Sequence, residues 1–273
     1  MPDPVSWIAL GAAIGGAAGK FVERAWDSGE KWISSYFANH HEKAKARAKE
    51  NTISFLNDLA MRIESLEESK RVTVEQISSA QEHPDFSVAL QKAMISASQT
   101  ESKEKHQLLS RLVTERIKAT PESLIALASK LACDAISYTN SNQLKTLGLL
   151  INLLYVISDQ DLTEEQYIEW LQLRINPFMG LQIRVIDLDH LESLSCLNFI
   201  PSITHDLKKT LAEKNKGKFN YAIFKVTPLG KFLTDIWENQ HLRSTTLTSI
   251  GKIIGVMVTD QIAGTATKMD GWE

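Results

Sequence analysis

Cationic side chains recur along one predicted helix near the middle of the chain, between residues 103 and 118. Arginines and lysines on one helix can follow the phosphates of a nucleic-acid backbone, so the pattern predicts a site for an anion or a nucleotide ligand. The alternative is a solvated face whose charges pair, because Arg111 and Glu115 are four residues apart. The first interpretation assigns ligand binding to Lys103, Lys105, His106, Arg111, Arg116 and Lys118.

A second basic cluster lies just before two aromatic residues, Phe219 and Tyr221. Lysines beside aromatic rings can contact DNA, although both rings also fit the core positions of a strand. The net charge of −3 argues against a protein built mainly to bind nucleic acid. The lysines of this cluster are Lys208, Lys209, Lys214, Lys216 and Lys218.

The sequence carries none of the common catalytic or metal-binding motifs, such as a P-loop, GxGxxG, GxSxG or HExxH. We therefore predict a non-enzymatic protein with no catalytic residue, no metal site and no cofactor. Cys133 and Cys196 each lie in an apolar helical pattern, which indicates buried, reduced thiols in an intracellular protein.

The most informative segment for function is the apolar N-terminus. Residues 5–19 carry no charge, and Asp3 and Pro4 suit the start of a helix. Gly11, Gly15 and Gly19 are four residues apart, a spacing that lets helix backbones approach closely. The bulky residues Trp7, Leu10 and Ile14 lie on another face of the same helix.

Two leading interpretations of this segment stay open, and a disordered terminus is the third. As a membrane-active or pore-forming helix, it reaches the length of a span only if it continues to Trp26 with Lys20, Glu23 and Arg24 facing water or a partner. As a small-residue helix, it would instead pack inside a soluble core or oligomer. The start of the chain has no basic residue before Lys20, so a signal peptide is not expected.

The remaining pattern predicts a mainly α protein. Apolar residues at helical spacing indicate a multi-helix bundle, with capping boxes at Thr73 and Thr163 and a helix start at Thr120-Pro121. Alternation predicts strands at 181–185 and 219–226, with a helix opened by Thr227-Pro228. This order is typical of a small winged-helix-like α/β segment.

These elements predict four regions along the chain. Residues 1–27 form a protruding apolar helix, and 28–177 form a helical oligomerisation or sensor domain. Residues 178–240 form the winged-helix-like domain, and 241–273 form a C-terminal packing helix and tail.

The stretch from His83 to about Ile157, which begins HPDFSVALQKAMISASQ, resembles bacterial proteins found with anti-phage defence genes. With the glycine-patterned N-terminus, the chain resembles the effector subunits of the Hailong defence system. The resemblance implies a homotetramer that a partner nucleotidyltransferase controls through its product, a short single-stranded oligodeoxyadenylate. It also implies a cytoplasmic protein while the ligand is bound. Loss of the ligand would release the N-terminal helices to form a channel in the bacterial inner membrane.

Our leading hypothesis is therefore a pore-forming effector of abortive infection that depolarises the cell. One alternative is a winged-helix DNA-binding regulator that uses the second lysine cluster. Another is a purely structural soluble oligomer in which the N-terminal helix is part of the core.

Overall fold

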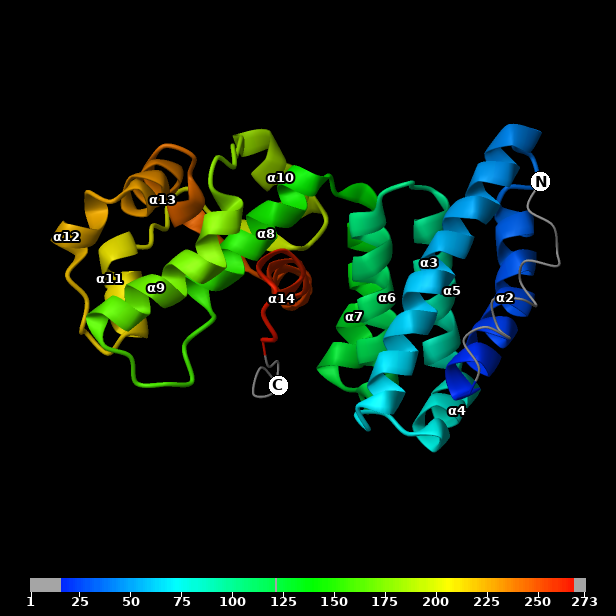
Figure 1. The fold of residues 1–273 in the computed structure, drawn as a ribbon. Helices are drawn as coiled ribbons and strands as arrows, with labels where there is room; N and C mark the ends of the chain where they lie inside the picture. Colours follow the sequence, from blue (N-terminus) through cyan, green and yellow to red (C-terminus); the bar gives the residue numbers. More distant parts are fainter. Residues whose placement is uncertain (1–15, 121, 268–273) are drawn as a thin grey trace. The chain divides into compact units, whose positions relative to one another are not determined.

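The computed structural model describes residues 16–120 and 122–267 (Figure 1). As predicted, the chain is mainly α-helical, and in the described part its helices are accompanied by one small two-stranded sheet. The chain divides into two compact units, Met1–Tyr138 and Thr139–Glu273. This division falls within the segment 28–177, so the residues predicted as one helical domain are shared between both units.

The first unit is a helical bundle in which α3 packs against α2, α5 and α6, while α7 packs against α5 and α6 (Figure 1). Phe55, Leu56 and Leu59 of α3 are fully buried at the centre of these contacts. The helices are α2 (Gly16–Tyr36), α3 (Glu42–Glu68), α4 (Val74–Glu82), α5 (Pro84–Ser98), α6 (Lys103–Lys118) and α7 (Leu124–Tyr138).

The second unit is built around α8, which packs mainly against α14 (Figure 1). A Cβ atom at Gly255 of α14 would lie 2.6 Å from the carbonyl oxygen of Leu147, so glycine is needed for this close approach. The helices are α8 (Ser141–Leu154), α9 (Glu164–Ile175), α10 (Val185–Ser193), α11 (Leu207–Lys214), α12 (Tyr221–Lys225), α13 (Pro228–Glu238) and α14 (Ser249–Ala263). Short 3₁₀ turns, η1 (Asn176–Phe178) and η2 (Leu242–Ser244), follow α9 and α13.

Several predicted helix starts are confirmed by their hydrogen bonds. Thr73 and Thr163 form reciprocal capping boxes with Gln76 and Gln166. The hydroxyl of Thr227 accepts from the backbone N–H of Gly230 at the start of α13. The predicted start at Thr120-Pro121 is wrong, because α7 begins at Leu124 and the hydroxyl of Ser123 accepts from the Ala126 N–H.

Both predicted strands are wrong. The sheet consists of β1 (Leu197–Phe199) and β2 (Thr245–Leu247), which pair antiparallel with Leu197 opposite Leu247. Around residues 181–185 the backbone forms hydrogen bonds with side chains and pairs with no neighbouring strand in the described part of the chain. The Ile183 N–H, for example, donates to Gln240 Oε1 at 2.6 Å. Residues 221–225 form the short helix α12, which Asn220 caps. The two strands on which the winged-helix prediction was based are therefore not found at the predicted positions.

The predicted N-terminal helix lies mostly outside the described residues. From Gly16 onward the chain belongs to α2, and Ala18, Phe21 and Val22 are buried in the bundle. The predicted boundary at residue 27 therefore falls inside a packed helix, and residues 16–27 do not protrude. Among the helices that the structure describes, none combines the length and the apolar character needed to cross a membrane.

Candidate functional site

The helix α2 joins the apolar N-terminal segment to the bundle. Its buried face recurs every three or four residues and packs against α3, α5 and α4. Lys20, Glu23 and Arg24 are exposed on the opposite face. The buried residues of this face are Ala18, Gly19, Phe21, Val22, Ala25, Gly29 and Ile33.

Two contacts fix α2 against α5. The ring of Phe21 meets Phe86 edge to face with centroids 6.0 Å apart. Two turns further along α2, the backbone at Gly29 lies against the side chain of Met94, and a Cβ atom there would be 1.9 Å from Met94 Cε. A glycine at this position lets the two helices approach closely around a buried methionine.

The predicted pore and helix-packing residues are thus only partly described. Gly19 is buried in α2, where a small residue suits a helix interface. The others, Trp7, Leu10, Gly11, Ile14 and Gly15, lie outside the described residues.

The predicted ligand-binding side chains of α6 do not share one surface, because His106 and Arg116 are buried. His106 Nδ1 lies 3.2 Å from the Ser54 hydroxyl, and Nε2 lies 2.9 Å from the Thr100 carbonyl oxygen. Arg116 donates to Asp85 in an ion pair and to the Ala119 carbonyl oxygen at 3.0 Å. Both side chains are therefore committed to contacts inside the bundle.

The remaining cations of α6 lie closer to solvent. Lys103 and Lys118 are exposed, and Lys118 pairs with Glu115 at 2.6 Å. Lys105 donates to the Ser137 carbonyl oxygen, and burial lowers the pKa of its ammonium group. Charge pairing on this helix is thus confirmed for part of the set.

The structure adds two residues of α3 that sequence reasoning missed. Arg62 donates from Nε to the Ser110 hydroxyl of α6 at 3.2 Å. Burial, and next the positive charge of Arg111, lower the pKa of Arg62, while burial raises the pKa of Asp58. Asp58 and Arg62 stand four residues apart on a helix, which is the signal that could have placed them on one face. Arg62 and Arg111 form the α3–α6 arginine pair.

The lysines of the second basic cluster also differ in burial and in the groups they contact. Lys214 is buried, whereas Lys216 and Lys218 both pair with Asp161 at 3.3–3.4 Å. Lys209 lies 3.8 Å from Glu213 on the same helix. Three of the five positive charges therefore face carboxylates of this chain, which weakens the argument for a DNA-binding surface.

Lys214 belongs to a buried polar cluster at the end of α8. Its ammonium group donates to the carbonyl oxygens of Asn152 and Val156 at 2.5 and 2.8 Å, where the helix leaves carbonyls without helical partners. Arg174 donates to the Asn152 side chain at 2.7 Å and to the Thr267 hydroxyl at 2.8 Å. Burial, and next the charge of Arg174, lower the pKa of Lys214 to about 7.

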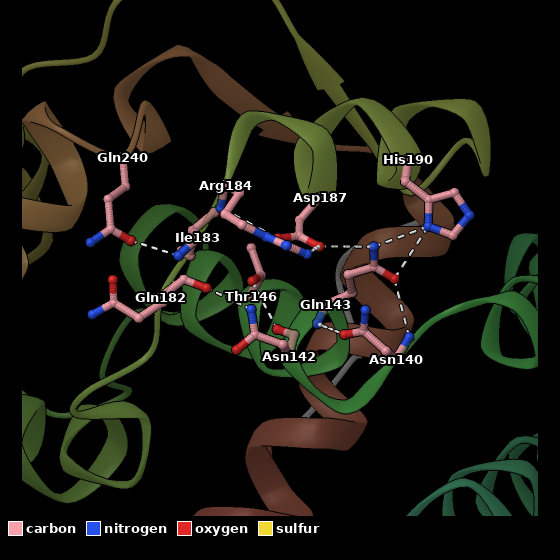
Figure 2. A network of polar contacts seen from close by, with 10 residues as sticks. All are labelled: Asn140, Asn142, Gln143, Thr146, Gln182, Ile183, Arg184, Asp187, His190 and Gln240. Atoms are coloured by element: carbon pink, nitrogen blue, oxygen red, sulfur yellow. Dashed lines mark hydrogen bonds and ion pairs between the residues drawn. The ribbon is translucent and has the colours of Figure 1, made fainter.

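A second polar network joins α8 to α10 (Figure 2). The buried amide of Gln143 caps its own helix through Asn140, donates to Asp187 at 3.3 Å and lies 3.0–3.2 Å from His190 Nδ1. Arg184 donates twice to Asp187, and these hydrogen bonds hold the pKa of the carboxyl below its usual value. The groups of this network form hydrogen bonds with one another. The network therefore has a structural role, because it fixes where α10 begins.

Within residues 16–120 and 122–267, no group of three or more histidine, cysteine, aspartate or glutamate side chains could hold a metal ion. Cys133 and Cys196 are buried free thiols, as predicted, and burial raises both pKa values to about 12.

Comparisons with known proteins place the chain in a family. No curated protein and no solved structure matches the chain. A model of a family of unknown function matches residues 19–223, which include most of α2, the α3–α6 arginine pair and both basic clusters. Because this match covers well over half of the sequence, the chain belongs to that family.

Proposed function

We propose that this protein is a bacterial defence effector whose apolar N-terminal segment permeabilises the inner membrane once a bound ligand is lost. The observation that carries the proposal is the direct continuity between the uncharged residues 5–15 and α2, which is fixed in the bundle. A change in the packing of α2 would therefore also move the point at which the apolar segment is attached. The proposed role in the response to phage infection is based on the resemblance to Hailong effectors.

The ligand in this proposal is a short single-stranded oligodeoxyadenylate supplied by a partner nucleotidyltransferase. The α3–α6 arginine pair supports an anionic ligand, because the positive charge of Arg111 adds to burial in lowering the pKa of Arg62, while the charges of Asp58 and Glu115 act in the opposite direction. Guanidinium groups are strong donors to phosphate oxygens. Lys103 is exposed on the same helix as Arg111 and adds a positive charge. His106 and Arg116 are left out of the ligand site because they are buried.

Membrane activity is tested in bacteria that express the chain while a potential-sensitive dye reports depolarisation. Deletion of residues 2–15 is expected to abolish depolarisation, and Gly15→Leu is expected to reduce it because a bulky side chain blocks close helix contacts. The matched control is Ser28→Leu, which adds the same side chain to the exposed face of α2. Depolarisation by the deletion variant at the level of the full chain would refute the proposal.

Ligand binding is tested separately by fluorescence anisotropy with labelled oligodeoxyadenylate. Arg62→Gln and Arg111→Gln are each expected to weaken binding by about tenfold, the loss of one charge-assisted contact of roughly 1.5 kcal/mol. Lys209→Gln is the control, because this lysine lies in the second unit beside Glu213. Equal affinity of all three variants and the unaltered chain would exclude the arginine pair as the ligand site.

A further inference from the structure

The short helix α12 of the second unit exposes two large aliphatic side chains where the chain turns into α13. Ile223 and Val226 are 60% and 67% exposed, and they stand three residues apart, so they lie on one face. Two lysines, Lys225 and Lys231, lie beside them in the sequence. We call these four residues the α12 corner. Figure 1 shows α12 at the edge of the second unit, where it packs against α13.

The α12 corner is firmly attached to the second unit. Phe224 is fully buried, and its carbonyl oxygen accepts from the N–H and the hydroxyl of Thr227 at 3.0 and 2.7 Å. A Cβ atom at Gly230 of α13 would lie 2.0 Å from the same oxygen, so glycine lets α13 pack directly on the backbone of α12. The fold itself therefore holds Ile223 and Val226 in their exposed positions.

The two lysines of the corner are available to an anion. Lys225 and Lys231 are exposed, and no carboxylate of the described residues forms an ion pair with either of them. Asp235, which stands one helical turn after Lys231, accepts instead from the side-chain amides of Asn239 and Gln240 at 2.7 and 3.2 Å. The corner therefore combines an exposed aliphatic pair with positive charge that the chain does not neutralise.

We propose that the α12 corner docks on an anionic lipid surface, with Ile223 and Val226 inserted among the headgroups and Lys225 and Lys231 facing the lipid phosphates. Burial of aliphatic side chains and attraction to anionic lipids act together in this kind of binding. A folded protein partner fits the corner less well, because a specific protein interface takes roughly 800 Å² from each partner, far more than two aliphatic side chains expose. A lipid surface needs no matching shape.

This inference does not depend on whether residues 5–15 enter a membrane. It concerns described residues of the second unit, and docking through them opens no channel by itself. Its consequence is that the chain collects at anionic membranes while its fold stays as described. Because only two aliphatic side chains and two lysines take part, we expect reversible binding that weakens as the salt concentration increases.

Cosedimentation of the full chain with phosphatidylglycerol vesicles tests the docking, with phosphatidylcholine vesicles as the uncharged comparison. Ile223→Asp should weaken binding to phosphatidylglycerol by about tenfold, because it replaces a buried aliphatic side chain by a negative charge. Lys225→Gln and Lys231→Gln should each weaken it by about fivefold and leave binding to phosphatidylcholine unchanged. The matched control is Ile186→Asp on α10, where the native side chain is 63% exposed. Equal binding of Ile223→Asp and Ile186→Asp, or no binding of the unaltered chain, would overturn the proposal.

An environment-sensitive fluorophore on a cysteine tests whether the corner enters the lipid. The native thiols are buried, so the label goes to Ile223→Cys or, as the control, to Ile186→Cys. With phosphatidylglycerol vesicles, the emission of the label at position 223 should shift to shorter wavelengths, and that of the label at 186 should not. Equal shifts at both positions, or none at 223, would contradict insertion of the corner.

Two further measurements separate the corner from other sources of binding. In a chain that lacks residues 2–15, the difference between Ile223→Asp and Ile186→Asp should persist; its loss would assign the vesicle binding to the N-terminal segment and overturn the proposal. Light scattering reports whether a second copy covers the corner instead. A mass that Ile223→Asp halves, together with no vesicle binding by the unaltered chain, would assign the corner to a second copy and also overturn the proposal.

Discussion

Gly29 of α2 lies so close to Met94 of α5 that a Cβ atom at position 29 would be 1.9 Å from Cε and 2.8 Å from Sδ of that methionine. Met94 is fully buried, and the end of its side chain would have to move for a larger residue at position 29 to fit. This contact therefore sets how closely the helix that follows the apolar N-terminus can approach the bundle.

Gly29→Leu should destabilise the first unit by about 1–3 kcal/mol, because overpacking forces Met94 and its neighbours out of their preferred positions. Ser28→Leu, which changes the exposed neighbour, should alter the free energy of unfolding by no more than about 0.5 kcal/mol. Urea unfolding followed by circular dichroism gives both values. Combining Gly29→Leu with Met94→Ala should cost less than the sum of the single changes; additive costs would show that the two residues do not press on each other.

Arg116→Met should lower the free energy of unfolding by about 3–5 kcal/mol, because it leaves the partly buried Asp85 without its ion-pair partner. Burial acts to raise the pKa of Asp85, but the hydrogen bond and charge of Arg116 outweigh it and hold the pKa below its usual value. The pair therefore stabilises the fold at neutral pH, and this contribution is lost as pH falls through the lowered pKa. Unfolding measured from pH 7 to about pH 3 should show a smaller acid loss in the variant than in the unaltered chain. Lys118→Met, an exposed change on the same helix, is the control.

Lys214 should make the protein more stable as the pH rises above 7. Its pKa is about 7 in the folded chain and about 10.5 in the unfolded chain, so between these values the unfolded chain binds the extra proton. The free energy of unfolding then increases from pH 7 toward pH 10, and Lys214→Met should remove this slope. Lys209→Met on the exposed side of α11 should keep it. Equal slopes in the two variants would mean that Lys214 does not titrate in this range.

Both cysteines should be unreactive in the folded protein. With pKa values of about 12 and no exposure, neither Cys133 nor Cys196 presents a thiolate at pH 8. A chromogenic thiol reagent should therefore detect no rapid reaction before urea is added and two thiols afterwards. Rapid modification of one thiol in the native protein would place that cysteine at a mobile or open part of the fold.

The helices were predictable where a local signal marks their ends. Thr73 with Gln76 and Thr163 with Gln166 each supply both hydrogen bonds of a capping box within four residues. The strands were not predictable in the same way. Alternation at 219–226 resembled a strand, but the side chain of Asn220 accepts from the N–H groups of Ala222 and Ile223 and favours a helical turn.

The ligand site was harder to predict, because helical spacing does not say which neighbour a charge will meet. Arg116 fits the polar pattern of α6, yet Asp85, thirty-one residues earlier, binds it inside the bundle. Conversely, Arg62 approaches Ser110 and Arg111 only because α3 and α6 pack side by side. Long-range packing thus decides which cations remain available to a ligand.

Dye release from phosphatidylethanolamine–phosphatidylglycerol vesicles, measured with purified protein, tests most directly whether the apolar segment on α2 is the membrane-active part. We predict that Gly29→Leu, which loosens α2, releases more dye than the unaltered chain or Ser28→Leu. We also predict that deleting residues 2–15 from the Gly29→Leu variant abolishes the release. Undiminished dye release by the deleted variant would contradict the account.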